Sequence, residues 1–337
     1  MKMEMLQPSG SFKSRGVGNY CLKALEKHRA NGLPEPMKFY ISSGGNAGLA
    51  AVSAATALGQ ECVVIVPETV TEFMRNKIQV AGGVVFAHGE SWQEADDFTR
   101  ELLAADPTGV YCSPFDHPDI WEGNSTMVEE IISELDGMAP DAIIASVGGG
   151  GMFAGIMQGL QRNGMEDVPV VAVETEGAHS LHAALKAGEL VSLPKISSIA
   201  TSLGARRVAP EAFRLGQQGN VISTVLTDEQ AAAACVKLLD DERLCVEVAC
   251  GVSVAVLYER LLPKLLPNLT PESQVVLVIC GGRCNITSIH RISLTQAQEA
   301  MSTSRPSAHI GRSTCLGVER LWYNCIEKAL RIFFVFH

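Results

Sequence analysis

The chain has 337 residues and a formal net charge of −10, and 47% of its residues are hydrophobic while only 6% are aromatic. The acidic balance, without a basic run interleaved with aromatic residues, argues against a nucleic-acid partner, and no uncharged apolar stretch is long enough to span a membrane. A chain of this length forms two lobes or one large α/β unit, with a core rich in Ala, Val, Leu and Ile.

Short apolar runs alternate with amphipathic or alanine-rich stretches along most of the chain. The runs are predicted as strands, at Met37–Ile41, Cys62–Val66, Val84–Ala87, Gly109–Cys112, Ala142–Val147, Val170–Val173 and Val275–Cys280. The stretches between them are predicted as helices, among them Gly16–Ala30, Ala47–Leu58, Ser91–Ala105 and Ile120–Leu135. This alternation predicts parallel sheets with crossover helices, in which ligands bind beyond the carboxyl ends of the strands.

The first distinctive segment is LQPSGSFKSRG, at Leu6–Gly16, which places one lysine between two clusters of small residues. Small residues allow a ligand to approach the backbone, and Phe12 offers that ligand a flat surface. Lys13 is therefore a candidate nucleophilic amine, although a lysine considered alone is more often a surface charge.

Polar or glycine-rich segments follow four of the predicted strands. The segment SSGGNAG, Ser42–Gly48, follows the first strand, and Gly148–Gly151 follows the fifth. Glu174 follows the sixth strand, and Cys280 ends the last one before two glycines. Because consecutive N–H groups at the start of a helix bind anions, Gly148–Gly151 is a candidate phosphate site, although glycines also permit a tight strand-to-helix turn.

The phosphate ligand has two interpretations. Gly149, Gly151 and Ala154 fit the looser dinucleotide-binding pattern, and Glu174 is placed for a ribose contact. These residues favour a nicotinamide-dependent dehydrogenase. The other interpretation is pyridoxal phosphate, whose aldehyde requires a lysine.

Pyridoxal phosphate gives every motif a role. Lys13 would form the Schiff base with the aldehyde, and Phe12 would pack against the ring. Asn46 would donate to the 3-hydroxyl, Gly148–Gly151 would hold the phosphate, and Cys280 would face the pyridine nitrogen. A dehydrogenase would leave the lysine and asparagine motifs without a role.

Five motifs occur in a characteristic order, QPSGSFKSRG, SSGGNAGLAA, SVGGGGMFAGI, ETEGAHS and VICGG. Together they resemble the serine/threonine dehydratases of the fold-type II pyridoxal-phosphate family, and most closely the eukaryotic L-serine dehydratases, over about Met3–Asn285. Cys280 stands where the cysteine synthases and tryptophan synthase β chains of the family use serine. This cysteine disfavours a cysteine synthase or a serine racemase.

The resemblance implies an α/β fold of two open, mostly parallel sheets with flanking helices, and a cofactor in the cleft between two lobes. We expect a small lobe over residues 16–115 and a large cofactor-binding lobe over residues 1–15 and 116–285. We expect an atypical tail over residues 286–337. Family members usually begin further upstream, so we also expect an N-terminally shortened member.

The resemblance also implies roles for individual residues. Lys13 is the Schiff-base lysine and removes the substrate α-proton. The other cofactor contacts are Phe12, Asn46, Gly148, Gly149, Gly150, Gly151 and Cys280. The loop that receives the substrate carboxylate contains Ser42, Ser43, Gly45 and Ala47. A monovalent cation, expected to be K+, is surrounded mostly by backbone carbonyls, at Glu174, Ala178, Leu203 and Ala205.

The implied reaction is the deamination of L-serine to pyruvate and ammonia, with a lesser activity on L-threonine. We expect a homodimer that binds small-molecule substrates and neither nucleic acid nor membrane. Because the ten cysteines form no CxxC pair and the N-terminus lacks a signal-peptide pattern, we expect a cytoplasmic protein, or a mitochondrial one if the natural N-terminus lies further upstream. The alternatives are the dehydrogenase and a catalytically inactive paralogue or binding protein.

Overall fold

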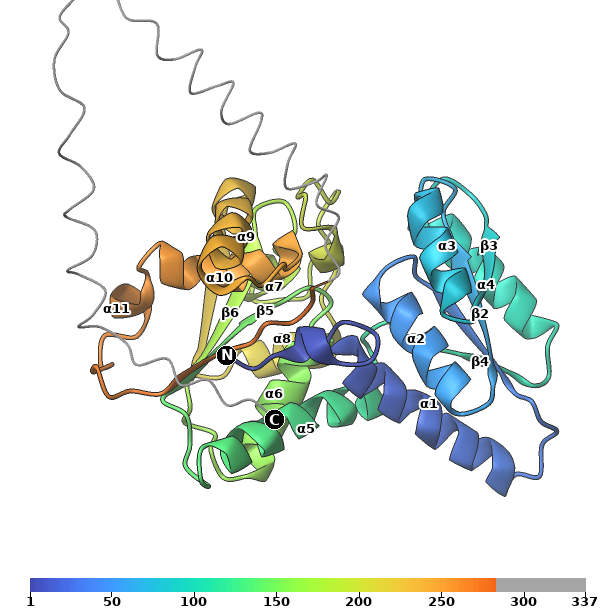
Figure 1. Cartoon of the computed structure of the whole chain (residues 1–337), viewed down its shortest axis with the longest axis horizontal. Helices are drawn as coiled ribbons and strands as arrows, with labels where there is room; N and C mark the ends of the chain where they lie inside the picture. The colour runs from blue at the N-terminus through green and yellow to red at the C-terminus, as the bar shows by residue number, and fades with distance from the viewer. Residues whose placement is uncertain (283–337) are drawn as a thin grey trace, which may run out of the picture.

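Each of two lobes is built on a four-stranded parallel sheet with helices packed against it (Figure 1). The lobes are seen in a computed structural model that describes residues 1–282. They confirm the predicted α/β class with two open parallel sheets. The tail expected over residues 286–337 lies outside the described residues.

The small lobe alternates helices with strands. Its elements are α1 (Lys13–Ala30), β1 (Lys38–Ser42), α2 (Asn46–Ala57), β2 (Glu61–Val66), α3 (Glu72–Val80), β3 (Val84–Ala87), α4 (Trp92–Ala104) and β4 (Gly109–Tyr111). The sheet has the order β3-β2-β1-β4. Phe39 and Ile41 pack in one core with α1, α2 and α3, whereas Tyr40 packs with α4, as the period of two in a strand requires.

The large lobe repeats this pattern around the strand order β7-β6-β5-β8. Its elements are α5 (Pro118–Glu134), β5 (Ala142–Ser146), α6 (Gly151–Arg162), β6 (Val170–Thr175), α7 (Ser180–Ala187), η2 (Thr201–Leu203), α8 (Pro210–Gly216), β7 (Val221–Leu226), α9 (Asp228–Glu242), α10 (Val248–Tyr258), α11 (Leu262–Leu265) and β8 (Val275–Leu277). Strand β7 is absent from the sequence prediction. It lies half-exposed at the sheet edge, and Ser223 and Thr224 interrupt its apolar run.

Helix α1 packs against both lobes, through α2 on one side and α5 on the other (Figure 1). At the crossing with α5 the backbones come so close that a Cβ on Gly16 would lie 2.6 Å from the Ile120 carbonyl oxygen. A Cβ on Gly123 would likewise lie 2.5 Å from the Arg15 carbonyl oxygen. The two glycines therefore allow this crossing, which holds the first turn of α1 at the junction of the lobes.

The segment ahead of α1 runs along the last strand of the large lobe. Lys2 forms a parallel bridge with Val278, and the Phe12 amide donates to the Cys280 carbonyl at 2.9 Å. Arg15 then forms ion pairs with the buried Glu4 at 2.7 Å and with Glu130 of α5 at 2.6 Å. The lysine motif is thus fixed between β8 and α5.

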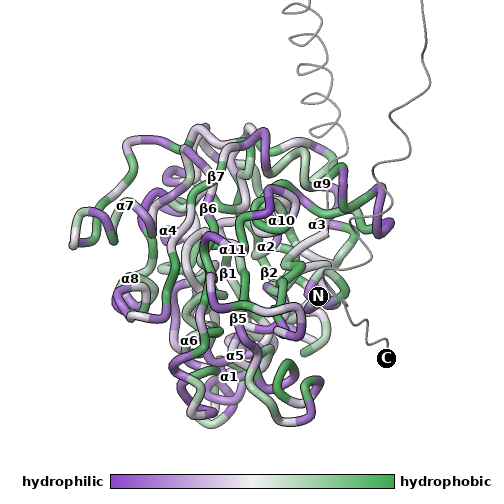
Figure 2. Tube along the Cα trace, turned by 90° about the vertical axis from the view of Figure 1, so that its left-hand side faces the viewer, coloured by the Kyte–Doolittle hydropathy of each residue, from purple (hydrophilic) through white to green (hydrophobic). Residues whose placement is uncertain are grey.

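Hydrophobic residues concentrate in the strands of both sheets and in α10, as the hydropathy colouring of Figure 2 shows. Strands β5 and β6 are buried along their whole length, as expected for parallel strands covered on both faces. Within residues 1–282, no helix combines the length and apolarity that a membrane span requires.

Candidate active site

The Lys13 side chain lies where the two lobes meet. Its Nζ donates to the carbonyl of Pro114, in the segment that links β4 to α5. The amine is 5.2 Å from the centroid of the Phe12 ring and 5.9 Å from that of Phe115. Burial lowers the pKa of Lys13 to about 8, although nearby Cys112, Glu247 and Cys280 act to raise it. A substantial fraction of the amine is therefore neutral, and hence nucleophilic, near that pH.

Cys280 lies beside the lysine segment, three residues beyond the end of β8. Its thiol is 3.4 Å from the hydroxyl of Ser146, at the end of β5. A hydrogen bond with Cys250 and burial raise the pKa of the Cys280 thiol well above its usual value. The thiol is therefore protonated and uncharged at neutral pH.

The glycine loop connects β5 to α6 and leaves an anion-binding surface of main-chain amides. Within residues 1–282, no acceptor is bonded to the amides of Gly148, Gly149 or Gly150. A Cβ on Gly149 would lie 2.4 Å from the Phe115 ring, and Gly150 has a φ of +90°. Both interpretations of the loop thus hold, because the glycines permit the tight turn and also expose amides at a helix N-terminus.

Asn46, the first residue of α2, reaches the large lobe through Glu247. Its Nδ2 donates to Glu247 Oε1 at 2.8 Å, and Ser202 Oγ donates to Glu247 Oε2 at 3.0 Å. Burial raises the pKa of Glu247. The sequence analysis missed this glutamate and Ser202, although a single charge within the apolar run LCVEVACG could have revealed the former.

The predicted carboxylate-binding loop connects β1 to α2. The Ser42 hydroxyl is buried and has no partner within residues 1–282, while the Ser43 hydroxyl accepts from the Gly45 amide at 3.4 Å. Ala47 lies buried in the first turn of α2. The loop therefore places small side chains at a helix N-terminus, where an anion is favoured.

Residues 1–281 match the family described as pyridoxal-phosphate dependent enzymes. The chain belongs to this family. This result confirms the family predicted from the motifs, and a nicotinamide-dependent dehydrogenase is no longer needed to explain the glycine loop.

Several relatives of this pyridoxal-phosphate-dependent enzyme carry a named activity. The chain is 42% identical over 309 residues to an L-serine dehydratase/L-threonine deaminase from Homo sapiens, and the match covers 91% of each chain. It is 43% identical over 297 residues to an L-serine dehydratase from Saccharomyces cerevisiae strain AWRI1631, covering 84% of this chain and 88% of the relative. The crystal structure of a fungal L-serine ammonia-lyase from Rhizomucor miehei superposes with a TM-score of 0.81 at 34% identity, covering 87% of this chain and 91% of that one.

The residues at the lobe junction fit pyridoxal phosphate. The unpartnered amides of Gly148–Gly150 suit its phosphate, and Lys13 offers a partly neutral amine for its aldehyde. The buried hydroxyls of Ser11 and Ser42 have no partner within residues 1–282, so each keeps an unused hydrogen-bonding capacity near this junction. The cofactor would be held by residues from both lobes, with Cys280 and Asn46 beside its ring.

The predicted cation site surrounds Glu174, at the end of β6. Both carboxylate oxygens of Glu174 accept from the first turn of α7, at 2.9 Å from the Leu181 amide and 2.8 Å from the His182 amide. Burial raises the pKa of Glu174 to about 8, although these two hydrogen bonds act to lower it. Glu174 thus caps α7, and the part played by Ala178, Leu203 and Ala205 in holding K+ stays a prediction.

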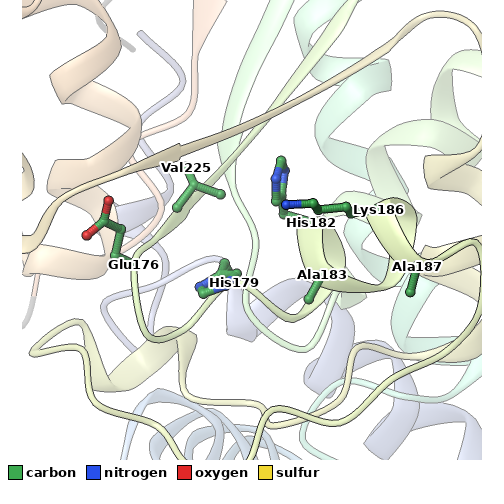
Figure 3. Close-up of a pocket in the computed structure, with 7 residues that line it drawn as sticks. All are labelled: Glu176, His179, His182, Ala183, Lys186, Ala187 and Val225. Atoms are coloured by element: carbon green, nitrogen blue, oxygen red, sulfur yellow. The ribbon is translucent and has the colours of Figure 1, made fainter.

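A separate hollow lies beside α7 and includes none of the predicted site residues in its lining (Figure 3). It has a volume of about 620 Å³ and is lined by Glu176, His179, His182, Ala183, Lys186, Ala187 and Val225. The His182 ring is 3.0 Å from the Ser223 hydroxyl, and the His179 ring accepts from the Gly177 amide. Within residues 1–282 no three His, Cys, Asp or Glu side chains converge on a metal position.

Proposed function

We propose that this pyridoxal-phosphate-dependent enzyme deaminates L-serine to pyruvate and ammonia, and deaminates L-threonine less efficiently. The observation that carries the proposal is the juxtaposition of the partly buried Lys13 amine with the uncharged Cys280 thiol, held by the hydrogen bond from the Phe12 amide to the Cys280 carbonyl. The names of the relatives, which are serine dehydratases and a serine ammonia-lyase, support this reaction.

Lys13 is the residue that moves protons. When bound, pyridoxal phosphate withdraws electrons from the substrate α-carbon, so that the α-proton becomes acidic and the β-hydroxyl can leave. Lys13 Nζ accepts that α-proton in its neutral form, and its pKa of about 8 places it close to the pH at which a general base is most effective. The Pro114 carbonyl, which accepts from Nζ, orients the amine.

The uncharged thiol of Cys280 determines how the reaction continues. A protonated thiol is a weak donor, so it does not deliver a full proton to a ring nitrogen that it faces. Negative charge on the substrate is therefore stabilised less than it would be beside an aspartate. Prompt loss of the β-hydroxyl is favoured over reactions that need a long-lived carbanion.

The loop between β1 and α2 would bind the substrate carboxylate. The helix N-terminus favours a negative charge there, and the Ser42 hydroxyl is free to donate. We infer that Ser43, Gly45 and Ala47 complete this subsite from the small lobe. Closing the small lobe over the carboxylate would then exclude water from Lys13.

The decisive experiment adds L-serine to the purified, cofactor-loaded protein and follows pyruvate formation. Pyruvate should form from L-serine and 2-oxobutanoate from L-threonine, whereas the Lys13→Ala variant should lose at least about 1,000-fold in turnover because it lacks both the covalent anchor and the base. Cofactor binding without any turnover by the parent protein would favour the inactive paralogue. Retained turnover in Lys13→Ala would reject the role of the lysine.

We further propose that the enzyme is a homodimer and that K+ binds beside Glu174. Light scattering after size-exclusion chromatography tests the homodimer, and a monomer mass would reject it.

Exchanging K+ for Li+ tests the proposal that K+ binds beside Glu174. Turnover should fall in the parent protein and be insensitive to the exchange in Glu174→Gln.

A further inference from the structure

One carboxylate joins the two lobes at the candidate site, and the proposed mechanism does not use it. Glu247 Oε1 accepts from Asn46 Nδ2 at 2.8 Å, and Oε2 accepts from Ser202 Oγ at 3.0 Å. Asn46 begins α2 of the small lobe, whereas Ser202 in η2 and Glu247 ahead of α10 belong to the large lobe. The contact therefore spans the space between the lobes.

The backbone of Glu247 is fixed on the large-lobe side. Its amide donates to the Gly281 carbonyl at 3.3 Å, and its carbonyl accepts from the amides of Cys250 and Gly251 at 2.8 and 2.9 Å. A Cβ on Gly281 would lie 2.7 Å from Glu247 Oε1, so the carboxylate lies directly against the strand end that carries Cys280. These contacts fix the position of the Glu247 carboxylate, whereas the carboxylate of an exposed glutamate can adopt many positions.

A carboxylate in this position selects one orientation of the Asn46 amide. An ionised carboxylate only accepts hydrogen bonds, whereas an asparagine side chain has a donor end and an acceptor end. Asn46 must therefore turn its NH2 group toward Glu247, and the second N–H of that group remains available as a donor. Without Glu247 the amide could turn over and present its carbonyl instead.

We propose that Glu247 is a positioning residue, which orients the Asn46 amide across the lobe junction so that its N–H faces the cofactor. The inference rests on the proposed role of Asn46 as a donor to the cofactor ring. Ser202 holds the other carboxylate oxygen and so fixes the plane of the carboxylate.

The charges around Glu247 supply an independent signature. Burial raises the pKa of Glu247, whereas the hydrogen bonds from Ser202 and Asn46 and the charges of Lys13 and Lys77 oppose this rise and favour the ionised carboxylate. In return, the carboxylate acts to raise the pKa of Lys13, together with Cys112 and Cys280. Replacing Glu247 by glutamine keeps its shape but removes its charge, so the pKa of Lys13 should fall below about 8.

The test measures the Kd of pyridoxal phosphate for cofactor-stripped protein, because this readout needs no turnover. Glu247→Gln should weaken binding about tenfold, the size expected for a lost hydrogen bond to a charged group. The pH midpoint for chemical labelling of Lys13 should move downward in the same variant. The matched control is Glu272→Gln, at an exposed glutamate, which should change neither value.

A double-mutant cycle tests whether Glu247 affects cofactor binding through Asn46. If Glu247 acts through Asn46, Asn46→Ala alone should weaken cofactor binding. In a protein that already carries Asn46→Ala, adding Glu247→Gln should then raise the Kd by less than a further factor of two. Full additivity of the two losses would overturn the proposal, and so would a parent-like Kd in Glu247→Gln alone.

A second variant covers the case in which Glu247→Gln does not fold. Ser202→Ala keeps the charge and the Asn46 contact but releases one carboxylate oxygen. It should weaken cofactor binding about threefold without moving the Lys13 midpoint, and an unchanged Kd would overturn the proposal. A parent protein that binds the cofactor but does not turn over L-serine would reject the proposed function and leave this result interpretable.

Discussion

The Lys13 amine is partly desolvated at the lobe junction, and this desolvation sets its chemistry. Burial disfavours the charged form, so the pKa falls from 10.5 to about 8 even though Glu247 lies close enough to oppose the fall. Lys13 does not form an ion pair with that carboxylate, because its Nζ donates to the neutral Pro114 carbonyl instead. An amine in this state can act both as a nucleophile and as a base.

Capture of pyridoxal phosphate by cofactor-stripped protein should therefore depend on pH in a defined direction. Only the neutral amine attacks the aldehyde, so the rate should rise through about pH 8 and level off above it. Stopped-flow absorbance after mixing with the cofactor measures this rate. A midpoint near the ordinary lysine value of 10.5 would contradict the buried position of the amine.

The crossing of α1 with α5 shows how the elements place Lys13 at the lobe junction. Gly16 faces the Ile120 carbonyl at the contact, whereas Gly18, two residues later in the same helix, has no atom within 4 Å of the position of a Cβ. One glycine is required for the close approach of two backbones, and the other only weakens its helix.

The two glycines form a matched pair for mutagenesis. Gly16→Ala should lower the free energy of unfolding by about 1–3 kcal/mol, because its methyl group would push α1 away from α5. Gly18→Ala should raise it by about 0.5–1 kcal/mol through better helix propensity. Urea unfolding of both variants checks the signs. Equal effects would mean that the crossing does not depend on Gly16.

The elements could be predicted from the sequence where an apolar run is continuous. Strand β3 occupies the predicted residues, although it is largely exposed at the sheet edge, because its four residues are all apolar. Strands β5 and β6 begin at the predicted residues because buried parallel strands are apolar throughout. Strand β7 was not predicted because polar residues interrupt its apolar run. Strand β8 ends at Leu277, short of the predicted Cys280, since the chain beyond it turns to bond with the N-terminal segment.

The candidate site could be predicted only as a set of motifs. Lys13, Asn46 and Cys280 each stand out locally, through small neighbours or a position after a strand. Glu247 and Ser202 are different, because their importance depends on a contact across 201 and 45 residues of chain respectively. The lone charge in LCVEVACG marks Glu247 as unusual, but its partners become visible only after tertiary folding brings Asn46 of the small lobe and Ser202 of the large lobe beside it.

In the whole molecule, the proposed cofactor contacts come from both lobes. Asn46 and the loop before it belong to the small lobe, while the glycine loop and Cys280 belong to the large lobe. A ligand held from both sides binds the assembled molecule and neither lobe alone. Its binding free energy is therefore added to the stability of the whole fold.

Cofactor loading should accordingly stabilise both lobes together. At a concentration about 100 times its Kd, pyridoxal phosphate should raise the free energy of unfolding by about 2.7 kcal/mol. Hydrogen exchange should slow in β2 as well as in β6, and Lys13→Ala should show a smaller gain because it binds the cofactor without a covalent link. Protection confined to the large lobe would contradict a site shared by both.

The bond between the Phe12 amide and the Cys280 carbonyl has a consequence for biosynthesis. A ribosome makes the lysine motif early, but the strand that receives it leaves the exit tunnel only after most of the protein has been translated. Until then the nascent lysine is hydrated and its ammonium group is a poor nucleophile. Capture of pyridoxal phosphate is therefore expected only after the Cys280 segment has been synthesised, and a chain stalled before Cys280 should not form the coloured Schiff base.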